Sequence, residues 1–194
     1  MPFLDLPPQM QERVVCSISA AVKYEVPANI VLAVAEKEGG RPGQWVRNAN
    51  GTDDVGALQF NTGYLRELRR YGITAQHVAA AGCYPYDLAA WRLRMHIKND
   101  AGDIWTRAAN YHSRASRFNS IYRADLIRRA LKWADWLEAR FPTHDVLASA
   151  MPPRSARPTS ATTAALPEKI RQTESLTVST SSYVPRKLLI SGQP

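Results

Sequence analysis

The segment ANIVLAVAEKEGG, residues 28–40, constrains the fold of this chain more than any other stretch. Its first two-thirds is almost entirely apolar, which is typical of a helix buried inside a protein core. Pro27 suits the start of such a helix, and the two closing glycines suit its end. The pattern therefore predicts a buried helix that finishes on two carboxylates, Glu36 and Glu38.

Helical geometry separates these two glutamates. Glu38 follows Val34 by four residues and Val31 by seven, so it shares their apolar face, whereas Glu36 points about 200° away. Glu38 also lies in the last turn, where the helix dipole disfavours a second negative charge. Burial and dipole both raise a carboxyl pKa, and an acid that stays protonated near neutral pH suits general acid catalysis. The alternative is an ordinary glutamate neutralised by Arg41.

Apolar periodicity predicts a mainly α domain with at most a small β element. The loop after the buried helix is rich in Gly, Asn and Asp, which predicts an irregular loop or a short hairpin around Asn50-Gly51. A last stripe of large apolar residues runs up to Phe141, so the domain is expected to span residues 1–142. The predicted helices cover residues 10–23, 28–38, 62–71, 86–98, 103–111 and 119–141.

The composition changes after residue 142. Residues 143–194 are rich in Ser, Thr, Pro and Ala and contain few large apolar side chains. Such a segment buries too little surface to offset the entropy of ordering it. We therefore expect 143–194 to be a flexible, disordered tail, in which the short apolar piece KLLI is either a docking peptide or without a role.

Charge and hydropathy limit the function classes without choosing among them. The net charge of +8 favours contact with polyanions such as nucleic acid, anionic lipid or cell-wall polymer. No basic helix or aromatic stacking platform is visible, so nucleic acid is not an expected partner. No apolar run is long enough to span a membrane, and the N-terminal residues show no recognisable signal peptide.

The two cysteines, Cys16 and Cys83, leave two interpretations open. Their spacing does not match a zinc site, and no other metal-binding pattern is present, so no metal is expected. They are either two buried free thiols or one disulfide. A disulfide requires an oxidising compartment such as the periplasm.

Three short motifs follow one another along the chain: the helix end at Glu38, VGALQFN at residues 55–61, and AANYHSR at residues 108–114. Together they resemble the lytic transglycosylases of the lysozyme superfamily, whose usual forms are E-S, G-L-M-Q-I-N and A-Y-N-A-G. The stretches NANGTDDVGALQFN, RRYGI and AGCYPYDLAAWRL are similar to the specialised enzymes of conjugation, type IV secretion and pilus systems. The resemblance covers roughly residues 10–140.

The resemblance implies a lysozyme-like domain with a substrate cleft and assigns roles to individual residues. Glu38 matches the single catalytic acid/base of the family. Tyr111 matches the aromatic residue that hydrogen-bonds the catalytic carboxylate. A bridge from the first helix is also expected in this subgroup, which favours a Cys16–Cys83 disulfide. The residues expected to bind substrate are Gly56, Gln59, Asn61, Tyr111 and His112.

Several positions depart from the family pattern. Gly39 replaces the usual Ser, and Ala57-Leu58 replaces Leu-Met in the cleft loop. His112 stands where the family has Asn, so it is either a sugar ligand or an ordinary histidine of the surface or core.

The implied activity is that of a periplasmic peptidoglycan lytic transglycosylase without a cofactor. It cleaves the β-1,4 bond between MurNAc and GlcNAc and leaves a 1,6-anhydro product. Its partners would be glycan strands and, through the tail, components of a secretion, conjugation or pilus complex. Two alternatives are a hydrolytic muramidase that uses Asp53 or Asp54 as its second carboxylate, and a non-enzymatic accessory that binds DNA or the envelope.

Overall fold

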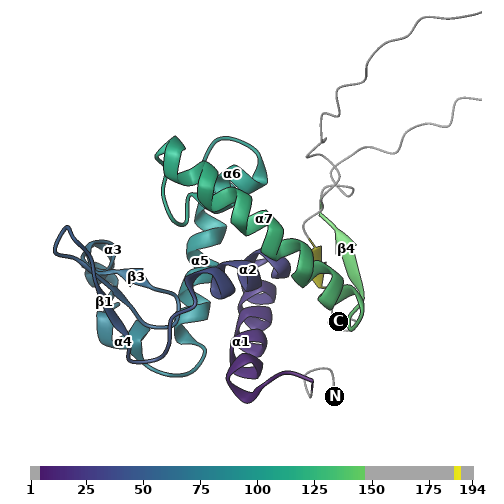
Figure 1. Cartoon of the computed structure of the whole chain (residues 1–194), viewed down its shortest axis with the longest axis horizontal. Coiled ribbons are helices and arrows are strands. Elements are labelled where there is room, and N and C mark those ends of the chain that lie inside the picture. The colour runs from purple at the N-terminus through teal and green to yellow at the C-terminus, as the bar shows by residue number, and fades with distance from the viewer. Residues whose placement is uncertain (1–4, 147–185, 189–194) are drawn as a thin grey trace, which may run out of the picture.

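The predicted buried helix is present as α2 (Ala28–Glu38), which lies near the centre of the computed structural model in Figure 1. Every residue from 28 to 35 is buried. Pro27 precedes its first turn, and Gly39 ends it with a φ of +60°, a left-handed conformation that glycine adopts without steric cost. The structure describes residues 5–146 and 186–188.

Three helices pack around α2 and form the core with it. They are α1 (Pro8–Tyr24), α5 (Tyr84–Asn99) and α7 (Ser116–Glu138). The buried stripe of α7 contains Leu126, Ala130 and Leu137, each fully inaccessible to solvent, as its periodicity predicts. The remaining helical elements are α3 (Thr62–Leu68), the short 3-10 helix η1 (Arg69–Tyr71), α4 (Ala75–Ala79) and α6 (Ile104–Ala109).

The predicted hairpin is part of a three-stranded antiparallel sheet made of β1 (Trp45–Arg47), β2 (Asp53–Val55) and β3 (Phe60–Asn61). Trp45 pairs with Val55 in the first ladder, and Val55 pairs with Phe60 in the second. Val55 and Phe60 are fully buried and anchor the sheet to the helical core. The expectation of a mainly α domain with a small β element is therefore confirmed.

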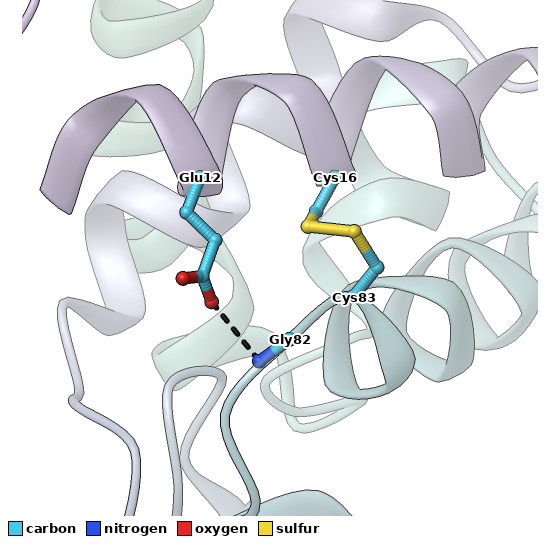
Figure 2. Close-up of a disulfide and its surroundings, with 4 residues drawn as sticks. All are labelled: Glu12, Cys16, Gly82 and Cys83. Atoms are coloured by element: carbon cyan, nitrogen blue, oxygen red, sulfur yellow. Dashed lines mark hydrogen bonds between the residues drawn. A yellow bond between two sulfur atoms is a disulfide. The ribbon is translucent and has the colours of Figure 1, made fainter. Parts of the chain in front are cut away.

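Cys16 and Cys83 form a disulfide, as the resemblance predicts. Figure 2 shows the bridge joining α1 to the residue that precedes α5. A hydrogen bond of 3.0 Å from the Gly82 amide to the Glu12 carboxylate lies beside it. The two bonds hold the start of α5 against α1.

The last helix of the described residues, α7, ends at Glu138, and the domain boundary at residue 142 stays a prediction. Most of the predicted tail, 143–194, lies outside the described residues. Two short parts of it pair as antiparallel strands, β4 (Thr143–Asp145) and β5 (Arg186–Leu188). Among the described residues, no helix combines the length and hydrophobicity needed to cross a bilayer.

Candidate active site

Glu38 lies in a cavity of about 820 Å³, within the size range of small-molecule and cofactor sites. A smaller cavity of about 190 Å³ shares the lining residues Glu38, His112 and Phe118 with it, so Glu38 borders both cavities. The larger cavity is lined mostly by polar side chains. Its lining residues are Glu38, Asn48, Ala49, Asn50, Asp54, Gln59, Asn61, Arg92, Tyr111, His112, Ser113 and Phe118.

The Glu38 carboxyl is held by Tyr122, whose hydroxyl donates a hydrogen bond of 2.7 Å to Oε1. Burial raises the pKa of this carboxyl from 4.5 to about 7. The Tyr122 hydrogen bond and the positive charge of Arg92 lower that pKa, and the negative charge of Asp54 raises it. Burial outweighs the opposing effects, so the group exchanges its proton near neutral pH.

Glu36 occupies the other side of α2, as helical geometry predicts. Its carboxylate pairs with Arg129 and accepts a hydrogen bond of 2.7 Å from the Trp133 indole, both on α7. Glu36 therefore helps to hold α2 against α7 and does not line the cavity. The predicted alternative for Glu38, an ion pair with Arg41, is not formed among the described residues.

Gln59, in the loop after β2, and Asn61, in β3, both line the cavity, but their amide groups are largely engaged. Gln59 has a φ of +49°, and its side-chain amide donates a 2.8 Å hydrogen bond to the Gly56 carbonyl. The Asn61 amide donates to Thr52 at 2.8 Å and to Asp54 at 2.9 Å. Asn61 thus braces the sheet and the carboxylate of Asp54, and its substrate-binding role stays a prediction.

Gly56 does not line the cavity, and its close approach is to protein backbone rather than to a ligand. With a φ of +74°, its α-carbon faces the Val78 carbonyl, and an added Cβ would lie only 2.1 Å from that oxygen. Gly40 is similarly confined, since an added Cβ would lie 2.2 Å from the Gly56 carbonyl. These glycines pack the end of α2, the loop and α4 closely together.

Tyr111 lines the cavity, but its described hydrogen bond is not to the Glu38 carboxyl, so that part of the prediction is wrong. Its hydroxyl donates to the Leu58 carbonyl at 3.3 Å, and its ring is almost fully buried. Tyr122 makes the expected hydrogen bond instead. A signal for Tyr122 exists in the sequence, because it precedes Leu126 by four residues and so continues the buried stripe of α7.

His112 lines both cavities and packs against Tyr122, the tyrosine that hydrogen-bonds Glu38. Its ring stacks on Tyr122 with centroids 4.9 Å apart and planes 4° apart. Burial lowers the pKa of His112, which favours the neutral imidazole. The histidine is therefore placed both to orient Tyr122 and to offer a ring nitrogen to a ligand.

The two aspartates of the hairpin are separated by strand alternation. Asp54 lines the cavity, whereas Asp53 forms an ion pair of 3.2 Å with Arg47 on the neighbouring strand. Only Asp54 is thus positioned as a second carboxylate for Glu38. Within residues 5–146 and 186–188, no group of three or more His, Cys, Asp or Glu side chains is arranged to hold a metal ion.

No family model matches this chain. Two curated proteins are similar to it, Protein IpgF of Shigella flexneri and Protein IpgF of Shigella sonnei. Each is 28% identical over 124 residues, which cover 61% of this chain and 81% of the relative. The similarity therefore spans most of each relative and leaves more than a third of this chain outside it.

Proposed function

We propose that this protein is a lytic transglycosylase that cleaves the β-1,4 bond between MurNAc and GlcNAc in peptidoglycan. The observation that supports this most is Glu38, a carboxyl with a pKa of about 7 that lines a large polar cavity and a smaller cavity with which it shares three lining residues. A polymer substrate needs binding space around the bond that is cleaved, which these cavities offer beside the carboxyl. The polar side chains of Asn48, Asn50 and Ser113 also line this cavity and suit the hydroxyl and N-acetyl groups of sugars.

Glu38 carries both proton transfers in this mechanism. Its protonated form donates a proton to the glycosidic oxygen while the N-acetyl group of the MurNAc sugar assists at the anomeric carbon. The resulting carboxylate then accepts the proton of the 6-hydroxyl of the same sugar, and that oxygen attacks the anomeric carbon. The 1,6-anhydro ring closes without water, and Glu38 is protonated again. Tyr122 stabilises the carboxylate form by its hydrogen bond.

Mass spectrometry of the fragments released from purified peptidoglycan sacculi tests this proposal. The wild-type protein should release muropeptides with 1,6-anhydro ends, and a Glu38→Gln variant should release at least a hundredfold less, as expected on losing a general acid. Glu36→Gln is the matched control, since Glu36 is two residues away and outside the cavity. Near-full activity of Glu38→Gln would exclude Glu38 as the acid.

A hydrolytic muramidase is the second candidate, and the position of Asp54 supports it. This carboxylate lines the same cavity as Glu38 and is close enough to raise its pKa. A hydrolase with two carboxylates would leave reducing ends instead of anhydro ends. Under the transglycosylase proposal, Asp54 braces Asn61, and Asp54→Asn should lower the yield without changing the product. Reducing ends from the wild type that vanish in Asp54→Asn would favour the muramidase.

The proposed setting is the periplasm, where glycan strands are accessible and a disulfide persists. We further propose that the enzyme opens the wall locally for a secretion, conjugation or pilus complex, with residues 143–194 as the part that contacts other components. Pull-down of such components by the full chain, compared with a chain ending at residue 146, tests this role of the tail.

A further inference from the structure

Arg92 is a cation in the cavity that the mechanism above does not use. It comes from α5, lines the large cavity together with Glu38, and contacts two tyrosine rings. The guanidinium carbon is 4.1 Å from the Tyr64 ring centroid and 4.6 Å from that of Tyr111. The two rings come from α3 and from the segment after α6, so three separate parts of the fold position this one side chain.

No described residue accepts a hydrogen bond from Arg92 or forms an ion pair with it. Its Nε is buried and has no hydrogen-bond partner. Other arginines that contact the core are paired, such as Arg129 with Glu36. Aromatic stacking occupies the faces of a guanidinium and leaves the N–H groups at its edge available. Arg92 therefore lines the cavity with a guanidinium whose N–H groups have no described acceptor.

Neither carboxyl that lines the cavity with Arg92 accepts a described hydrogen bond from it. Glu38 accepts from Tyr122, and Asp54 accepts from Asn61. The charge of Arg92 nevertheless acts on the site: it opposes the burial that raises the pKa of Glu38 and Tyr111, and it adds to the burial that lowers the pKa of His112. An uncompensated, partly desolvated guanidinium is an unfavourable arrangement unless an anion completes it.

We propose that Arg92 is a specificity residue that binds a carboxylate of the glycan substrate beside the bond that Glu38 cleaves. This inference rests on the proposed function and adds a substrate preference to it. Two sources supply such a carboxylate: the lactyl group of MurNAc where no peptide is attached, and the acidic groups of attached stem peptides. Both offer the planar, two-oxygen acceptor that a guanidinium edge binds in bidentate fashion.

The test compares charged substrates with their neutral derivatives. The substrates are peptide-free glycan strands and strands with stem peptides. Each is used once with free carboxylates and once with its carboxylates converted to neutral methylamides. The enzymes are the wild type, Arg92→Gln and Arg92→Lys. For at least one strand type, the methylamide should raise the KM of the wild type roughly tenfold, the usual effect of losing one charge-assisted hydrogen bond. The ratio of the KM for the methylamide strand to the KM for the charged strand should fall to about one in Arg92→Gln. It should stay well above one in Arg92→Lys, which keeps the positive charge.

A matched control keeps packing effects apart from recognition. Arg70 stacks on Tyr71 at 4.8 Å, outside the cavity, so Arg70→Gln makes the same chemical change and should keep the wild-type KM ratio. Dissociation constants measured in a Glu38→Gln background decide the question without turnover. If no anhydro ends form, the proposed function fails, while a charge-dependent affinity that requires Arg92 still supports the binding role. Two results would overturn the binding role of Arg92. One is that Arg92→Gln loses the same affinity for charged strands as for methylamide strands. The other is that the wild type binds both kinds of strand equally well.

Discussion

The Tyr122 hydroxyl lies 2.7 Å from the Glu38 carboxylate, although 84 residues separate the two in sequence. This contact joins α7 to the end of α2 and provides the carboxyl with its one described hydrogen bond. A hydrogen bond to a carboxylate favours the charged form, whereas burial favours the neutral form. The pKa of about 7 is the balance of these two effects, with burial dominant.

This balance predicts the pH dependence of the reaction. Because the acid must be protonated, kcat/KM should be constant in acid and fall above about pH 7. Tyr122→Phe removes the hydrogen bond that lowers the pKa of Glu38, so the fall of kcat/KM with pH should begin at a higher pH. The maximal rate should also drop roughly tenfold. Tyr111→Phe is the control, since the Tyr111 hydroxyl binds the Leu58 carbonyl and its loss should leave the fall in place. A fall near pH 4.5 in the wild type would contradict the raised pKa.

The raised pKa also predicts how stability depends on pH. Between about 4.5 and about 7 the folded state keeps a proton on Glu38 that the unfolded chain releases, so the free energy of unfolding falls as pH rises. Glu38→Gln removes this effect and keeps an acceptor for Tyr122. The variant should match the wild type near pH 4 and exceed its stability above pH 7 by on the order of 3 kcal/mol. Urea unfolding at pH 4, 6 and 8 measures this difference. A gain that is equal at all three values would point to packing instead of ionisation.

The sequence predicts the helices and the position of Glu38 well because both depend on local periodicity. α2 runs over the predicted residues, and Glu38 points to the interior while Glu36 points to α7. α4 is missing from the prediction, since five residues are too few to show a helical period. β3 contains two residues and is missed for the same reason.

The partners of Glu38 could not be predicted in the same way, because they depend on how distant helices pack. Motif order places Tyr111 beside the acid, but the ring is buried against Arg92 and its hydroxyl reaches Leu58. Arg92 itself carries no local signal, since arginine on a helix is usually solvated. Its role follows only from the two rings, Tyr64 and Tyr111, that three-dimensional packing brings to it.

Gly56→Ala should disrupt the loop that carries Gln59. The new Cβ would lie 2.1 Å from the Val78 oxygen, and the φ of +74° adds backbone strain. Gly51 is a matched control, because its φ is +79° but nothing lies within 4 Å of an added Cβ. Gly51→Ala should cost about 1 kcal/mol and keep activity, whereas Gly56→Ala should cost about 3 kcal/mol or more and lose it. Equal midpoints for the two variants in thermal unfolding would show that the contact with Val78 is relieved without cost.

Reduction of the Cys16–Cys83 disulfide should destabilise the fold without altering the chemistry of the site. The bridge closes a loop with a sequence separation of 67, for which chain entropy predicts a loss of about 4 kcal/mol on opening. Neither cysteine lines the cavity, so residual folded protein should keep its product pattern. Urea unfolding with and without dithiothreitol measures the effect in the wild type. In a Cys16→Ser, Cys83→Ser double variant, dithiothreitol should change nothing, and the midpoint should match that of the reduced wild type. A wild-type midpoint that does not respond to the reductant would mean that the bridge does not stabilise the folded chain in solution.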